Sequence, residues 1–87
     1  MVREKEMIKL AEAPPGRELR ILDIQGGEVV RRRLFALGFH KGDLIEVNSK
    51  GIFRGPLLIK NLTSDTSVAL GRGVAGKIMV DLFSDGQ

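Results

Sequence analysis

The sequence has 87 residues, of which 43% are hydrophobic and 29% charged, a balance typical of one globular domain and not of a disordered chain. It contains no cysteine and one histidine, which excludes disulfides, thiolate nucleophiles and cysteine-based zinc sites. The net charge of +3 is a mild excess, smaller than the clustered positive charge typical of a sequence-reading nucleic-acid binder.

The N-terminal part predicts a polar segment followed by a strand. Residues 1–9 alternate in charge, contain no signal-peptide core and are expected to be frayed. Residues 10–16 (LAEAPPG) predict a short helical turn stopped by two prolines. In residues 18–24 (ELRILDI) the apolar alternation slips between Ile21 and Leu22, which predicts a strand with a bulge. No apolar run approaches the roughly 20 residues that span a bilayer, so we expect a cytoplasmic protein.

A helix is predicted over residues 28–37. Val30, Leu34 and Leu37 recur with helical spacing and form one apolar face. Gly38 follows the last of them and can adopt the left-handed conformation that ends a helix. Phe39 is then expected to fold back onto Leu34, as this type of helix end requires.

The opposite face of this helix carries the first candidate site. Arg31 and Arg32 lie opposite the apolar face, Arg33 lies at its edge, and Phe35 falls between Arg31 and Arg32. Three arginines on a helix are more often a solvated face than a binding site. An exposed aromatic residue between arginines, however, has the composition of a protein-interface hot spot. We therefore predict a protein contact at Arg31, Arg32 and Phe35.

Four further strands are predicted at residues 44–48, 56–62, 67–70 and 77–83. The last of them, KIMVDLF, alternates with Ile78, Val80 and Leu82 inward and with Met79 and Asp81 outward. Five short strands that each hide one apolar face fit a two-layer sandwich or a small, partly open barrel, with the helix plugging or flanking it. The sequence thus predicts a mainly β fold, whose open strand edges leave self-association as an alternative to a monomer.

The loop of residues 49–56 (SKGIFRGP) is the second candidate site. It carries two apolar residues and one arginine between glycines, namely Ile52, Phe53 and Arg54. Loops on a rigid scaffold commonly carry binding residues, so we predict that these three contribute to partner contact. The alternative is that Phe53 closes one end of the barrel.

Two motifs that resemble reactive sites are interpreted structurally. Residues 71–76 spell G-x-G-x-x-G, but a strand follows where a dinucleotide site needs a helix. We expect a tight helical turn there, with Val74 or Ala75 in the core. His40 is alone in a polar turn, and neither Asp43 nor Glu46 completes a recognisable metal spacing. No catalytic residue, metal ligand or cofactor site is predicted, and we expect that the protein is not an enzyme.

Three segments in order resemble one family. The run of residues 33–42 (RLFALGFHKG), the pair Gly55-Pro56 and residues 69–80 (ALGRGVAGKIMV) resemble the ferrous iron transport protein A family, FeoA. The likeness covers residues 8–82, and the order and spacing of the segments carry it. One departure is Lys41, where the family often has proline before Gly42.

The resemblance implies an SH3-like β-barrel with an inserted helix, here over residues 10–83 between a polar segment at 1–9 and a tail at 84–87. It also implies a small cytosolic accessory protein of bacterial ferrous iron uptake, an adaptor whose partner is the membrane iron transporter FeoB, which has a cytosolic GTP-binding domain. With one histidine and no cysteine, the chain has few of the ligands that Fe(II) sites use.

Two other functions remain as alternatives. The first is the SH3-like domain of a metal-dependent repressor, which normally follows a DNA-binding region, whereas here about nine residues precede the fold. The second is a small-barrel RNA-binding protein, which would use exposed aromatic residues and basic grooves. Four phenylalanines, no tyrosine or tryptophan and a charge of +3 make this second alternative the weaker.

Overall fold

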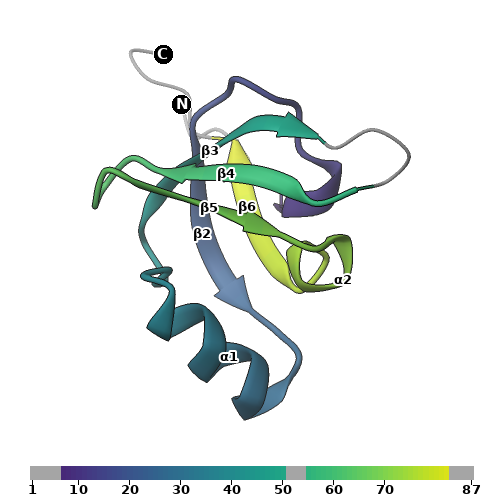
Figure 1. The fold of residues 1–87 in the computed structure, drawn as a ribbon, viewed down its shortest axis with the longest axis vertical. Helices are drawn as coiled ribbons and strands as arrows, with labels where there is room; N and C mark the ends of the chain where they lie inside the picture. Colours follow the sequence, from purple (N-terminus) through teal and green to yellow (C-terminus); the bar gives the residue numbers. More distant parts are fainter. Residues whose placement is uncertain (1–6, 51–54, 83–87) are drawn as a thin grey trace, which may run out of the picture.

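The computed structural model describes residues 7–50 and 55–82, which form one antiparallel sheet with a helix at its end (Figure 1). The strand order is β1-β6-β2-β3-β4-β5. In chain order the elements are β1 (Met7–Lys9), the 3₁₀ turn η1 (Leu10–Glu12), β2 (Leu19–Ile24), α1 (Gly27–Ala36), β3 (Leu44–Lys50), β4 (Leu57–Asn61), β5 (Thr66–Leu70), α2 (Arg72–Ala75) and β6 (Ile78–Leu82).

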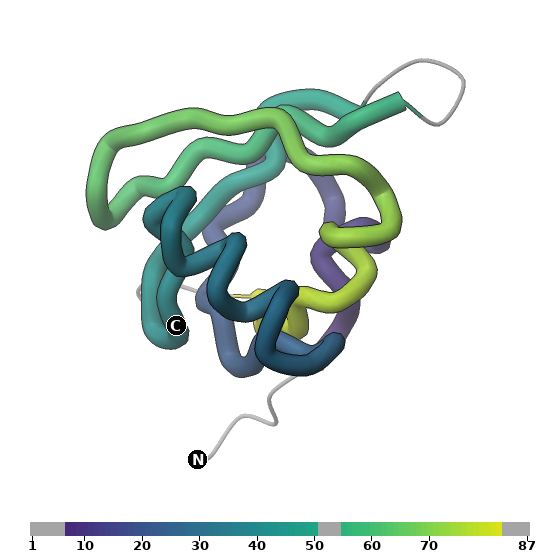
Figure 2. Tube along the Cα trace, turned by 60° about the horizontal axis from the view of Figure 1, so that its bottom comes forward, coloured from purple at the N-terminus to yellow at the C-terminus, as the bar shows by residue number. Residues whose placement is uncertain are grey.

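The strands curl around a common interior (Figure 2), which is filled by buried apolar side chains. Alternate residues of each strand point to the same side of a sheet, so curling brings one apolar set from every long strand together. Every strand from β2 to β6 contributes at least one core residue, among them Ile21, Ile45, Ile59, Leu70 and Val80. The predicted mainly β barrel with one inserted α-helix is confirmed.

Most predicted elements are found within two residues of their expected ends. The bulge predicted in the first strand is present, because the register of β2 against β6 shifts between Ile21 and Asp23. The segment at residues 71–76 forms the helical turn α2 between β5 and β6, with Ala75 fully buried. The turn predicted after residue 9 is η1.

The expectation that residues 1–9 are frayed is wrong for Met7–Lys9. These residues form a sixth strand, β1, which pairs antiparallel with β6. Ile8 lies opposite Val80 and packs partly against the core. Backbone pairing with β6 orders a segment whose own sequence contains one inward apolar residue. The predicted tail at 84–87 lies outside the described residues.

One predicted outward residue is covered, and one predicted orientation is wrong. Asp81 shares the outer face of β6 with the opposed residues Met7 and Arg20, both exposed, but is itself only 8% exposed, because β6 lies between β1 and β2. Leu37, expected on the apolar face of the helix, is 41% exposed, since α1 ends at Ala36 and Leu37 caps it. Of the inward set predicted for the last strand, Ile78 and Val80 are buried and Leu82 is half-buried.

Helix α1 lies across one end of the barrel (Figures 1 and 2) and contributes few residues to the core. Leu34 is its one fully buried residue. The helix ends as predicted: Gly38 is left-handed with φ +94°, and the backbone N–H of Phe39 donates to the carbonyl of Leu34 at 2.9 Å. Phe39 is buried, which anchors the end of the helix to the barrel. Val30 packs partly against the core, and the other residues of α1 are exposed.

Candidate protein-binding surface

Phe35 is the centre of the candidate surface on α1. Its side chain is 65% exposed, which confirms that it faces outward. The ring of His40 meets it edge to face, with centroids 4.5 Å apart. This contact holds the Phe35 ring against the turn that follows the helix, so a large apolar side chain is presented to solvent in a fixed position.

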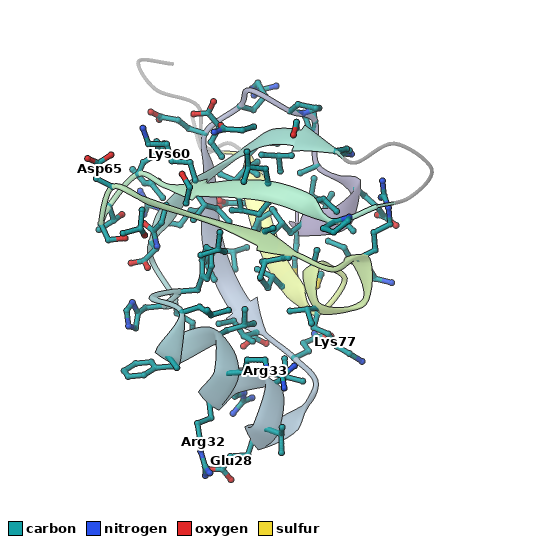
Figure 3. The ribbon with its side chains drawn as sticks, in the orientation of Figure 1. Glu28, Arg32, Arg33, Lys60, Asp65 and Lys77 are labelled. Carbon is teal, nitrogen blue, oxygen red and sulfur yellow. The ribbon has the colours of Figure 1, made fainter. Side chains whose placement is uncertain are left out.

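Arg31 and Arg32 both face outward but are held differently. The Nε of Arg31 donates to the carbonyl of Ile24 at 3.1 Å, which ties the guanidinium to the end of β2. Arg32 forms an exposed ion pair with Glu28 at 3.8 Å, one helical turn away, at the outer end of α1 (Figure 3). Such exposed pairs contribute little stability, so Arg32 is available for other contacts.

A surface hollow of about 300 Å³ lies beside Phe35, between α1, the end of β2 and the turn after the helix. We call it the Phe35 hollow. A second, more open hollow of about 500 Å³ adjoins it on the other side of Phe35 and Arg31. The residues that line the Phe35 hollow are Asp23, Ile24, Arg31, Phe35, Phe39, His40 and Lys41.

A hydrogen-bonded network fixes the turn that carries His40. Asp43 Oδ2 accepts from the His40 backbone N–H at 3.0 Å and from Asn61 Nδ2 at 3.0 Å, and lies 3.2 Å from His40 Nδ1. Partial burial raises the pKa of the Asp43 carboxyl, but the hydrogen bonds from Asn61 and His40 outweigh it and lower that pKa below its ordinary value. The ionised form of Asp43 is therefore the one the fold stabilises.

Asn61 joins this turn to the sheet. Its Nδ2 also donates to the carbonyl of Gly38 at 3.0 Å, and its Oδ1 accepts from the backbone N–H groups of Thr63 and Ser64. Only 1% of Asn61 is exposed. Asn61 was not predicted as a site residue, although it is a polar residue on the inward side of an otherwise apolar strand. His40 lies in a polar turn, as expected, and its ring is part-exposed while it contacts Phe35 and Asp43.

The second candidate site and the other predictions about metal and membrane are considered next. Ile52, Phe53 and Arg54 lie outside the described residues. Among residues 7–50 and 55–82, no three His, Asp or Glu side chains gather into a group that could hold a metal ion. No helix in this part of the chain is both long and apolar enough to cross a bilayer.

With the fold and the surface established, comparison with known proteins identifies the family. The sequence model of the FeoA domain matches residues 8–82. The chain belongs to the FeoA family. This confirms the resemblance found in the sequence. FeoA proteins are associated with ferrous iron transport and are not a known enzyme family.

Two relatives support the assignment. A protein of Methanocaldococcus jannaschii provisionally named Fe(2+) transport protein A is 35% identical over 75 residues, which cover 86% of this chain and 87% of the relative. The structure of Stenotrophomonas maltophilia FeoA complexed with zinc, described as a prokaryotic SH3 domain protein, matches with a TM-score of 0.69 and 30% identity over 83% of this chain and 87% of that one. The fold is accordingly SH3-like.

The same fold also occurs in a different functional class. A manganese-dependent transcriptional repressor matches with a TM-score of 0.81 and 18% identity, over 94% of this chain and 45% of the repressor. At this identity the likeness concerns the fold alone. It shows that an SH3-like barrel of this shape serves both FeoA proteins and metal-dependent repressors, so the fold does not by itself decide the function.

Proposed function

We propose that this protein is a cytosolic accessory protein of ferrous iron uptake and acts as an adaptor that contacts the cytosolic part of the membrane transporter FeoB. The observation that carries the proposal is Phe35, a 65% exposed aromatic side chain fixed by His40 and flanked by Arg31 and Arg32. Aromatic residues and arginine are the types enriched at the centres of protein interfaces. The FeoA family membership supports the connection with iron transport.

This surface fits protein binding better than catalysis. The described residues bring together a hollow, two arginines and an aromatic ring, but no nucleophile beside a base and no group of three metal-ligating side chains. We therefore propose that the protein is not an enzyme and holds no metal of its own. Ile52, Phe53 and Arg54 remain proposed as a second contact region.

Binding of the purified cytosolic part of FeoB to the full chain tests the proposal. Phe35→Ala is expected to weaken binding at least tenfold, about 1.4 kcal/mol, while changing the free energy of unfolding by less than about 0.5 kcal/mol, because the ring is largely exposed. Isothermal titration calorimetry measures the first and urea denaturation the second.

Leu58→Ala is the matched control. Leu58 is also a large apolar residue at the surface, 39% exposed, but it lies on β4, away from α1. It should leave binding unchanged. Absence of binding by the unaltered protein, or equal effects of the two substitutions, would contradict the proposal. A large loss of stability in Phe35→Ala would show instead that Phe35 supports the fold.

The two alternatives give different results. An RNA-binding barrel would bind single-stranded RNA at low salt and lose it as salt rises. A repressor-type regulatory domain would bind a repressor's DNA-binding region and not FeoB. Phe35 is the one exposed phenylalanine in the described part of the chain, whereas strand-binding barrels stack successive bases on several aromatic rings.

A further inference from the structure

The Phe35 hollow combines an apolar floor with a positively charged rim. Ile24 and Phe39, both largely buried, form apolar wall beneath the exposed ring of Phe35. Arg31 and Lys41 stand at the rim. This combination matches a ligand that has an apolar group at its centre and negative charge around it.

The two cations at the rim, Arg31 and Lys41, have N–H groups without a hydrogen-bond partner among the described residues. Arg31 uses its Nε on the Ile24 carbonyl, and its terminal amino groups have no hydrogen bond or ion pair with any described residue. Lys41 has none either within the described residues. Because one hydrogen bond positions the guanidinium, its remaining N–H groups can donate to the carboxylate of a ligand.

The acidic residue of the hollow does not cancel this charge. Asp23 is the one carboxylate in the lining, and its Oδ1 already accepts from the backbone N–H of Ile24 at 2.9 Å. Asp43 is also ionised, but it does not line the hollow and its Oδ2 is turned to His40 and Asn61. The lining itself carries two cations and one carboxylate, a net positive charge that favours a negatively charged ligand.

The size of the hollow favours a peptide. About 300 Å³ is the lower end of the range for ligand pockets and suits one large side chain with its neighbours. A nucleic acid strand would need further stacking rings, and one exposed phenylalanine serves a single anchor better.

We infer that the Phe35 hollow binds an acidic segment of the partner that carries one large apolar anchor residue, with carboxylates beside the anchor reaching Arg31 and Lys41. The inference deepens the proposed function and rests on it for the partner, which would supply this segment from the cytosolic part of FeoB. The anchor covers Phe35, and the carboxylates give the contact its specificity and its salt dependence.

Three blocked pentapeptides serve as probes. They are acetyl-Glu-Asp-Phe-Glu-Asp-amide, the same peptide with serine in place of phenylalanine, and acetyl-Lys-Arg-Phe-Arg-Lys-amide. Each is titrated into the ¹⁵N-labelled full chain and followed by NMR. The acidic anchored peptide is expected to shift the amides of Arg31, Phe35, His40 and Lys41. The other two are expected to bind at least about tenfold more weakly, because each lacks one half of the complementarity.

Substitutions matched in charge locate the contact. Arg31→Gln and Lys41→Gln are each expected to weaken binding of the acidic peptide at least about fivefold. Arg33→Gln removes the same charge from the same helix but lies outside the lining of the Phe35 hollow, so it should change binding less than about twofold. Lys41→Gln guards against a folding effect of Arg31→Gln, since Lys41 has no partner within the described residues.

The outcomes separate this inference from the proposed function. Equal effects of Arg31→Gln and Arg33→Gln, or equal binding of the basic peptide, would overturn the acidic segment. So would tighter binding of a single-stranded RNA of the same length or of anionic lipid vesicles. If FeoB binds and depends on Phe35 but not on Arg31 or Lys41, the adaptor function stands and this inference fails. If FeoB does not bind but the acidic peptide does, the chemistry of the hollow stands and the partner is another protein.

Discussion

At the scale of single residues, the Asn61 side chain has the most consequences for the surface. Its amide reaches Gly38, at the end of α1, and Asp43, in the following turn, while its oxygen holds the turn after β4. All of these bonds are made in a site that is almost fully closed to water, where an unpaired polar group is costly. Asn61 thereby fixes the turn that places His40 against Phe35.

Asp43 gives this network a pH dependence. The pKa of its carboxyl is lower in the folded state than its ordinary value of 3.8, so the folded state favours the ionised form. Its contribution to stability is present above the ordinary value and is lost as pH falls through the lowered, folded-state value. Asp43→Asn should reduce the free energy of unfolding by about 1 to 3 kcal/mol near pH 6, because it removes a charged acceptor.

The test compares the free energy of unfolding of the unaltered protein with that of Asp43→Asn. Urea denaturation from pH 6 to pH 2 should show the stability gap between the unaltered protein and Asp43→Asn shrinking below the ordinary value of 3.8. Other carboxylates titrate in both proteins and largely cancel. A gap that stays constant over this range would mean that Asp43 contributes through shape alone.

The sequence was enough to predict which residues of α1 face outward, but not to predict the burial of every residue on the sheet. Helical spacing is local, so the outward direction of Arg31, Arg32 and Phe35 followed from the sequence. The burial of Asp81 depends on β1 and β2, which flank β6 and come from the other end of the chain. The network of Asn61 joins residues up to 23 positions apart, which no local pattern reveals.

At the scale of elements, the position of the surface depends on how α1 ends. The N–H of Gly38 donates to Phe35 and that of Phe39 to Leu34, which turns the chain back towards the barrel. Phe39 then enters the core while His40 remains beside Phe35. Because Leu34 is the one fully buried residue of the helix, this end supplies much of its attachment.

Gly38→Ala should therefore cost stability without any collision. A Cβ at Gly38 would meet nothing within 4 Å, but the residue has φ +94°, where an L side chain is strained by about 1 to 2 kcal/mol. Gly73→Ala is the matched control, because its Cβ is equally unobstructed and its φ is not positive. It should leave stability unchanged or raise it by up to about 1 kcal/mol. Thermal unfolding of both variants measures the difference, and equal losses would refute this account of the helix end.

The helix and most strands were predictable because periodicity and end signals agreed. The helix had three spaced apolar residues and a glycine immediately after them. By contrast, β1 has three residues with only Ile8 turned inward, too few for an alternation to be recognised. Its order comes from pairing with β6, whose partner residues lie 70 to 74 positions further along the chain, and not from its own sequence.

At the scale of the whole molecule, the last strand lies in the interior of the sheet order. β6 is bordered by β1 on one side and β2 on the other, so the two ends of the described chain pair with each other within the sheet. Such long-range pairing is specified by the sum of the buried faces and not by any one segment. That is why the sequence predicted the barrel but placed one strand too few in it.

Removing β1 should accordingly weaken the whole barrel. A chain that starts at residue 7 is compared with one that starts at residue 10, so that the difference is Met7–Lys9 alone. The shorter chain loses the pairing with β6 and the partial burial of Ile8, together worth about 1 to 3 kcal/mol of unfolding free energy. It also uncovers the edge of β6, which favours self-association. Urea denaturation and light scattering measure the two effects.

Met7→Ser in the longer chain is the control, since Met7 is 57% exposed and should change stability by less than about 0.5 kcal/mol. Equal stability of the two chains would mean that β1 rests on the barrel without supporting it.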